Sequence, residues 1–268
     1  MHKKNKVLSV LGIFLVVSAI VSFIVFYFTV MASQQGYHYI DPETLELVQT
    51  EEIPEGAPIA VIKTSLGEIR AVLYPEYAPQ TVAQFTELAE SGYYNNTYVY
   101  EIKNDVYFSA GSADNDGNLP AVLPENCERV PRELHQNLWP FRGALCAMDT
   151  GSDGGVFKRL FRSETRFSGT RFLVVDSVDF TDAEFVQQFR EASGSDALAD
   201  AFIEHGGVPN FSQQMTIFGQ TYEGFDVVDA ICAAETFDSA SVTGYTPPKE
   251  DILILSVEIG QYSTEPET

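Results

Sequence analysis

The stretch GEIRAVLYPEYAPQTVAQFTELAESGYYNNT, residues 67–97, combines half of a hairpin with a helix. Apolar and polar side chains alternate along residues 68–74, and they also alternate along residues 58–65. A period of two is typical of a strand with one buried face, and Leu66-Gly67 between the two runs is a turn signal. The sequence therefore predicts a β-hairpin at the start of a folded domain.

The helix of this stretch follows directly. Pro79 stands at its predicted start, Thr81 and Gln84 have the spacing of a capping box, and Gly92 stands where the pattern ends. Its buried side is expected to carry Val82, Phe85 and Leu88.

The remainder of the chain indicates a mainly β protein. Its short strand-like runs, flanked by two helices, predict a closed antiparallel β-barrel capped by helices. Residues 180–206 look helical, with Thr181 and Glu184 as a second capping box. Further strands are expected near residues 97–103, 106–110, 143–148, 172–175, 215–222 and 251–261, and a further helix at 225–233.

The N-terminal region contains a run long enough to cross a membrane. Residues 7–32 are 26 residues without a charged side chain, after Lys3, Lys4 and Lys6. About 20 apolar helical residues span the hydrocarbon core, and the lysines favour a cytoplasmic N-terminus, residues 1–6. We expect a single-pass anchor with an extracytoplasmic domain. The alternative is a signal peptide cleaved near Ala32, which would release the domain as a secreted protein.

The segments around the domain are polar. Residues 33–57 have the acidic, aperiodic composition of a stalk, and residues 263–268 that of a disordered tail. This leaves a domain at residues 58–262, with insertions near 150–170 and 180–210. From residue 33 onward, 13 Lys and Arg oppose 38 Asp and Glu, a formal charge of −25. Such a charge argues against a nucleic-acid partner.

The three cysteines leave two alternatives open. An exported domain held by disulfides usually has more cysteines, in an even number. Cys127, Cys146 and Cys232 are therefore interpreted as small buried residues, with one bridge between Cys127 and Cys146 as the alternative. No His or Cys spacing in the chain is typical of a metal site.

Four segments, in order, resemble the cyclophilins, the barrel-type peptidyl-prolyl cis–trans isomerases. The stretch at 67–97 resembles the family's opening strands and first helix. ELHQNLWPFRGALCAM is similar to its acidic-His and Arg-Gly-x-Leu-x-Met region, MTIFGQTYEGFDVVDAI to its Val-Phe-Gly strand and second helix, and DILILSVEI to its closing strand. The resemblance covers about residues 58–262. It implies a cyclophilin-like barrel that acts on proline-containing exported polypeptides without a cofactor.

The catalytic positions of the family match poorly. Aligned with Phe-His-Arg-Val and the Phe-Met-x-Gln-Gly-Gly stretch, this chain has Glu101 at the Arg position and Ser109 at the Gln position. Met215 stands at a His position. In the family, a guanidinium donates toward the prolyl amide, whereas an ionised carboxylate only accepts hydrogen bonds. The resemblance therefore implies weak catalysis, with a non-catalytic proline-peptide-binding module or a structural interaction domain as the alternatives.

The resemblance also predicts an apolar binding slot, beside an added basic loop. The alternative is that half of the slot residues only fill the barrel core. The loop has 21 residues between Asp149 and Arg171, where the family pattern has about eight, and it includes Lys158, Arg159, Arg162 and Arg166. Arg171 is a candidate substitute donor; alternatively it pairs with Glu101, or the loop is only solvated. The slot would be lined by Tyr107, Phe108, Phe172, Leu173, Phe211 and Met215.

Overall fold

The computed structural model describes residue 22 and residues 44–119, 129–153, 165–237 and 244–264. In this part of the chain, no helix is both long and apolar enough to span a bilayer. The run at 7–32, apart from Ser22, lies outside it, as do Cys127 and most of the basic loop. The chain divides into two compact units, and the unit described here as the main body is residues 40–151 with 166–268.

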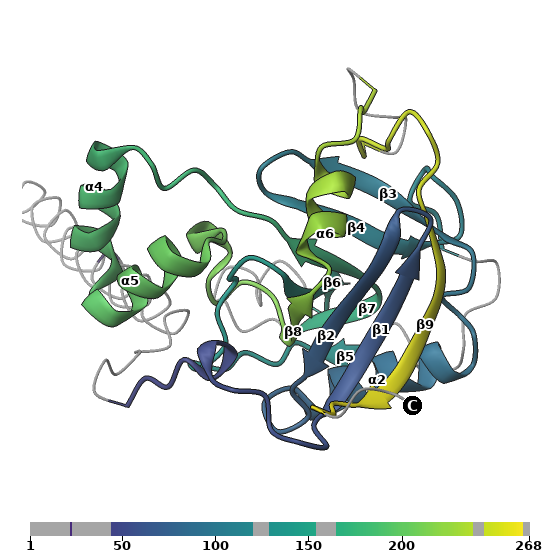
Figure 1. Cartoon of the computed structure of the whole chain (residues 1–268), viewed down its shortest axis with the longest axis horizontal. Coiled ribbons are helices and arrows are strands. Elements are labelled where there is room, and N and C mark those ends of the chain that lie inside the picture. The colour runs from purple at the N-terminus through teal and green to yellow at the C-terminus, as the bar shows by residue number, and fades with distance from the viewer. Residues whose placement is uncertain (1–21, 23–43, 120–128, 154–164, 238–243, 265–268) are drawn as a thin grey trace, which may run out of the picture. The chain divides into compact units, whose positions relative to one another are not determined.

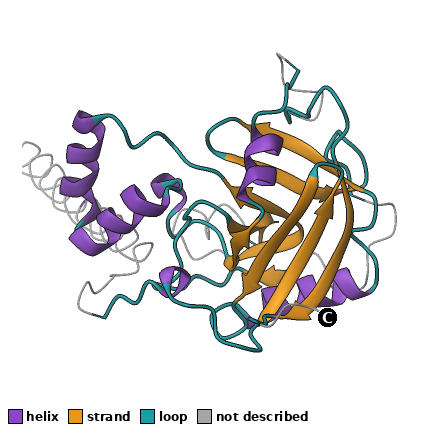
Figure 2. Cartoon of the chain, in the orientation of Figure 1, coloured by secondary structure: helices purple, strands orange, loops and turns teal. Residues whose placement is uncertain are grey.

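The main body is a closed β-barrel (Figure 1, Figure 2). Eight strands follow one another around it in the order β4-β3-β9-β1-β2-β8-β6-β7, and a pairing between β4 and β7 closes the ring. The two-residue β5 adds to the edge of β7. Their bounds are β1 Pro58–Thr64, β2 Gly67–Leu73, β3 Thr97–Lys103, β4 Tyr107–Ser112, β5 Val130–Pro131, β6 Ala144–Ser152, β7 Arg166–Val175, β8 Ile217–Glu223 and β9 Leu253–Gln261.

The predicted hairpin and barrel are confirmed. Strands β1 and β2 pair antiparallel, with Thr64 opposite Gly67 across the turn. The Thr64 hydroxyl accepts hydrogen bonds from the backbone N–H groups of Leu66 and Gly67, which stabilises that turn. Gly67 has φ 147°, where a Cβ would lie 2.5 Å from Val227, so glycine is required at this position.

The first helix, α2 (Pro79–Glu90), forms where expected, but its predicted capping box does not. Its N-cap residue, Ala78, offers no side-chain hydrogen bond. The carboxylate of Glu133 accepts instead from the backbone N–H groups of Gln80 and Thr81, at 3.1 and 2.9 Å. A carboxylate at a helix N-terminus satisfies free N–H groups and interacts favourably with the helix dipole. The cap therefore comes from a residue more than 50 positions away.

The predicted helix at 180–206 is two helices, α4 (Ala183–Ser193) and α5 (Asp196–His205). Gly194 has a left-handed backbone and ends α4, and the hydroxyl of Ser195 caps α5. The N-cap of α4 is Asp182, one residue after the predicted Thr181. The last helix, α6 (Phe225–Cys232), agrees with its prediction within one residue.

A segment that we name the strap, residues 44–57, packs on the domain although its composition predicts a stalk. It contains the short helix η1 (Val48–Thr50). Leu45 and Leu47 pack against a cluster that includes Trp139 and Phe202. The side chain of Gln49 accepts from the backbone N–H of Trp139 at 2.6 Å and donates to its carbonyl at 2.9 Å. These contacts attach the strap to the domain.

Candidate functional site

Three residues from three neighbouring strands form a row across the barrel wall. Glu101 on β3 is the register partner of Ser109 on β4, and Ser109 is the partner of Leu173 on β7. Register partners lie on the same face of a sheet. The positions aligned with the family's Arg and Gln are therefore brought opposite each other, beside an apolar residue of the predicted slot.

The row lies on the outer face of the barrel. Side chains alternate along a strand, and Phe108 and Val174, the neighbours of Ser109 and Leu173, belong to the interior core. Leu173 itself belongs to a second cluster. We name this second group the outer-face cluster; around this row it includes Val106, Tyr107, Met148, Leu173, Val175, Phe211 and Met215.

The cluster brings together four of the six predicted slot residues. Leu173 is buried, and Tyr107, Phe211 and Met215 pack against the cluster while half-buried. The rings of Tyr107 and Phe211 are 5.7 Å apart between centroids. Half-buried aromatic and Met side chains form an adaptable apolar surface, which suits contact with an apolar ring.

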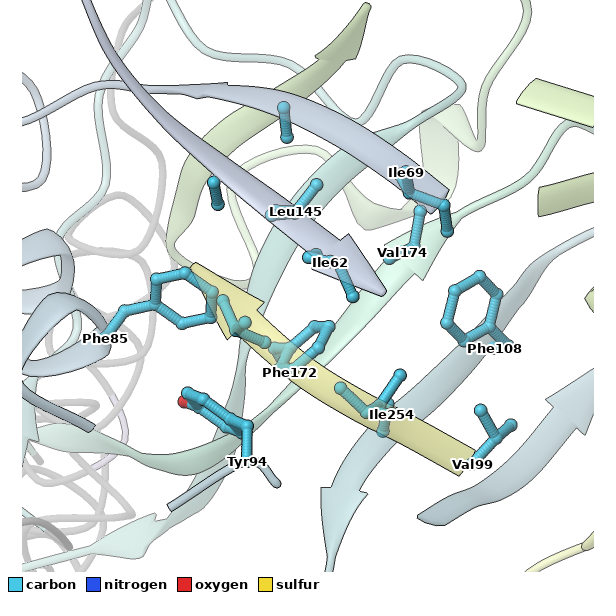
Figure 3. Close-up of a cluster of buried hydrophobic side chains, with 14 of the residues drawn as sticks. Ile62, Ile69, Phe85, Tyr94, Val99, Phe108, Leu145, Phe172, Val174 and Ile254 are labelled. Carbon is cyan, nitrogen blue, oxygen red and sulfur yellow. The ribbon is translucent and has the colours of Figure 1, made fainter. Parts of the chain in front are cut away.

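The other two predicted slot residues, Phe108 and Phe172, lie inside the barrel. Each is 1% exposed and belongs to the interior core (Figure 3). Phe172 packs edge-on against Phe85 of α2, with ring centroids 5.7 Å apart. A bound peptide on the outer face cannot contact them, so the prediction is wrong for these two residues. The reason is the strand period: only every second residue of β4 and β7 faces outward.

Glu101 is largely buried and has two polar neighbours. Only 6% of the surface of Glu101 is exposed. Its carboxylate lies 3.6 Å from the ammonium of Lys103, which is the register partner of Tyr107. Burial raises the pKa of the Tyr107 phenol, and the Glu101 carboxylate, which accepts its hydrogen bond, raises it further. The carboxylate is therefore compensated by a cation and by a neutral donor.

Ser109 contributes little polarity to the surface. It is fully buried, and its hydroxyl lies 3.9 Å from the sulfur of Met148. Thioether sulfur is a weak acceptor. The position aligned with the family's Gln thus holds a short side chain under Met148.

Arg171 neither pairs with Glu101 nor belongs to the outer-face cluster. Its guanidinium donates to the carbonyl of Gly117 at 2.6 Å. It also lies over the rings of Tyr100 and Tyr245, 5.3 and 5.9 Å from their centroids. The pair with Glu101 is therefore not formed, and Nη1 of Arg171 is engaged by Gly117, while its buried Nε has no hydrogen-bond partner. Of the basic loop, Arg166 pairs with Asp149 at 3.0 Å, whereas Lys158, Arg159 and Arg162 lie outside the described residues.

Sequence reasoning missed Lys103 and Met148. Lys103 follows Glu101 by two residues, so the strand period alone places it on the same face. Met148 comes from β6, which is remote in sequence, and no local signal indicates its contact with Ser109.

A cavity lies away from this row of residues. It has a volume of about 680 Å³, and neither Glu101, Ser109 nor the seven cluster residues named around them line it, although Val48, Tyr74 and Tyr77 of the same cluster do. In the described part of the chain, no group of three His, Cys, Asp or Glu side chains is placed to hold a metal ion. Cys146 and Cys232 are free, buried thiols, so the bridge from Cys127 to Cys146 is not formed.

The chain matches known proteins over this same domain. Residues 59–162 match the family described as cyclophilin type peptidyl-prolyl cis-trans isomerase/CLD. A Streptococcus pyogenes protein named "Putative bifunctional phosphatase/peptidyl-prolyl cis-trans isomerase" is 28% identical over 82% of this chain, and the match spans 42% of its own length. A Staphylococcus saprophyticus protein named "Putative peptidyl-prolyl cis-trans isomerase" is 26% identical over 74% of this chain and 90% of its own.

The fold is shared with solved structures. The crystal structure of a Cryptosporidium parvum cyclophilin type peptidyl-prolyl cis-trans isomerase, in the presence of the dipeptide Ala-Pro, matches with a TM-score of 0.52 and 16% identity. The match covers 75% of this chain and 98% of that one. The ordered motifs, the barrel, the family match and the curated relatives agree: residues 59–162 match the cyclophilin-type peptidyl-prolyl cis–trans isomerase family, and the described domain shares the cyclophilin fold.

Proposed function

We propose that this protein is a membrane-anchored cyclophilin that binds proline-containing segments of exported polypeptides on the outer-face cluster and isomerises them slowly. The row formed by Glu101, Ser109 and Leu173 carries the proposal. It combines an apolar surface for a proline ring with an acidic group where the family has a guanidinium. The Ala-Pro dipeptide in the crystals of the Cryptosporidium relative supports a proline-containing ligand.

The slow rate follows from the chemistry of the bond. Rotation about an X–Pro bond breaks the amide resonance, over a barrier of about 18–20 kcal/mol. A donor that favours the twisted amide lowers the barrier, and one positioned donor is worth ~10²–10³ in rate. The Glu101 carboxylate cannot donate while ionised. The Tyr107 phenol already donates to Glu101.

Lys103 is a cationic donor on this face, beside Glu101. Its ammonium contacts Glu101 and donates to the hydroxyl of Thr246 at 3.2 Å, while its side chain is 41% exposed. An ammonium has three N–H groups, so one is available to a bound peptide. It lacks the planar fork of a guanidinium. We infer a residual activity that depends on Lys103.

A proline isomerisation assay on the full chain in detergent tests this function. The expected rate is above the uncatalysed rate but at least tenfold below that of an ordinary cyclophilin measured in parallel. A rate within tenfold of the ordinary enzyme contradicts slow catalysis. No catalysis with measurable binding of an Ala-Pro peptide favours a non-catalytic module, and the absence of both favours a structural interaction domain.

The anchor rests on the charge pattern at residues 3–32 and has its own test. In intact cells, protease added outside should digest the acidic domain. Protection of the domain would contradict export, and a mature protein that begins near Ser33 would replace the anchor by a cleaved signal.

A further inference from the structure

The cavity of about 680 Å³ lies between the strap and the wall of the barrel. Residues 48–58 line it on one side and residues 72–77 and 220–222 on another, with contributions from Phe141, Arg142, His205 and Phe225. Its volume is within the ~300–1,000 Å³ that is common for ligand pockets. Glu101, Ser109 and Leu173 do not line it, so its occupant need not be the proline segment, although Val48, Tyr74 and Tyr77 belong to the outer-face cluster.

The wall formed by the strap is held by direct bonds. The amide of Gln49 bonds both backbone groups of Trp139 and donates to the side chain of Gln220 at 2.7 Å. At the other end, the backbone of Gly56 donates to the carbonyl of Tyr262 at 2.9 Å. The cavity is therefore formed before a ligand binds, which reduces the entropy lost on binding.

Aromatic rings line the barrel side. Tyr74 and Tyr77 meet edge to face, with centroids 6.2 Å apart. Tyr222 and Phe225 also line the cavity. The faces of such rings attract a cation within about 6 Å of the centroid.

The charge around the cavity is negative. Glu51 and Glu52 of the strap and Glu76 opposite line it, and they form no ion pair or hydrogen bond with described residues. Glu55 also lines it and accepts only from neutral groups of residues 263 and 264. The single arginine of the lining does not offset these carboxylates, because Arg142 pairs with Asp176 at 3.7 Å and with Asp229.

We propose that this cavity binds a Lys or Arg side chain of a basic polypeptide segment, between the rings of Tyr74 and Tyr77 and the carboxylates of Glu51 and Glu76. The aromatic rings would contact the methylene stem of the bound Lys or Arg and make a cation–π contact with its charged head, and the unpaired carboxylates would neutralise its charge. Burial and the charge of Glu51 raise the pKa of both phenols, so the two tyrosines stay neutral when the carboxylates are ionised. The site would retain a basic segment independently of proline.

Titration of the full chain with a proline-free peptide tests this proposal. The probe is acetyl-Gly-Lys-Ala-Lys-Gly-amide, and acetyl-Gly-Glu-Ala-Glu-Gly-amide is its matched acidic form. Saturable binding of the lysine peptide, weakened by salt, is expected, with no binding of the glutamate peptide. The double variant Glu51→Gln with Glu76→Gln should weaken binding about fivefold to tenfold, the sum of two exposed ion pairs.

The matched control is Glu87→Gln with Glu90→Gln, two exposed carboxylates of α2 that do not line the cavity. It changes the net charge equally and should leave binding within twofold. Equal losses in both double variants, equal binding of the two peptides, or no binding of the lysine peptide would overturn the proposal. None of these readouts uses proline, so they leave the isomerase function untouched.

Discussion

Glu101 and Ser109 stand opposite each other, in register, on strands β3 and β4 of the barrel. Both are buried, and the carboxylate of Glu101 lies 3.6 Å from the ammonium of Lys103. This relationship means that the two positions aligned with the family's Arg and Gln form one local unit. Changes at either position should therefore affect the same surface.

Replacing Glu101 by arginine should raise the isomerase rate by about tenfold or more, because it supplies a forked donor where a carboxylate only accepts. The proline isomerisation assay measures the effect, and circular dichroism checks that the variant is folded. Glu101→Gln is the control that removes the charge without adding a guanidinium. A folded Glu101→Arg protein no faster than Glu101→Gln would contradict the assigned limitation.

Adding Ser109→Gln to Glu101→Arg should raise the rate further only when Met148 makes room. Ser109 is fully buried beside Met148, and an overpacked side chain costs about 1–3 kcal/mol. We expect the double variant to unfold at lower urea than Glu101→Arg alone, and Met148→Ala to relieve that loss.

Lys103→Met should lower the residual isomerase rate by about tenfold, since the ammonium is the assigned donor. Lys63→Met is a matched control: Lys63 is 42% exposed and pairs with Glu258 at 2.6 Å on a part of the barrel outside the outer-face cluster. The control should leave the rate unchanged. Equal rates for the two variants would remove Lys103 from the mechanism.

Arg171→Met should destabilise the domain by about 2–3 kcal/mol without weakening peptide binding. The change removes a charge-assisted hydrogen bond to Gly117 and the contact with the rings of Tyr100 and Tyr245. Urea unfolding and an Ala-Pro peptide titration give the two values. Weaker binding at unchanged stability would instead make Arg171 a ligand contact.

Tyr100→Phe should stabilise the domain by about 1–2 kcal/mol at pH 7, because the Tyr100 hydroxyl is buried without a hydrogen-bond partner. Burial raises the pKa of Tyr100 to about 12. The phenol is protonated in both states below pH 10, but between pH 10 and 12 the unfolded chain loses this proton more readily, so the stability of the unchanged protein falls by about 1.4 kcal/mol per unit. The advantage of the variant should widen over that range in urea titrations. Tyr98→Phe, at a half-buried position of the same strand, should change stability little at pH 7.

Gln49→Ala should detach the strap and cost about 1–3 kcal/mol, because it leaves the backbone N–H of the buried Trp139 without its partner. It also removes one of two hydrogen bonds to the Trp139 carbonyl, which keeps the bond from the backbone N–H of Phe141 at 2.8 Å. Trp139 is the single tryptophan of the chain, so its fluorescence reports on this contact directly. Gln187→Ala removes an exposed side-chain bond on α4 and should cost under ~0.5 kcal/mol. Equal unfolding midpoints for the two variants would show that Gln49 does not hold the strap.

The order and type of the main elements were predictable because they depend on local periods. The alternation on both sides of Leu66-Gly67 and the apolar stripe of Val82, Phe85 and Leu88 identify a hairpin and a helix without any distant contact. The same period of two would have separated Phe108 and Phe172 from the outer face and placed Lys103 on it. It was enough to place one residue of each strand on the outer face of the barrel and to alternate the side chains from there.

By itself, the sequence determined the barrel family and the loss of the guanidinium at residue 101, since both are matters of residue order and type. Only the tertiary structure decided which groups meet across distant segments. Four contacts are of this kind: Glu133 caps α2, Met148 packs over Ser109, Arg171 lies over the rings of Tyr100 and Tyr245, and Gln49 bonds the backbone of Trp139. Each joins residues far apart in the chain, and their geometry is set by the closure of the barrel rather than by any local pattern.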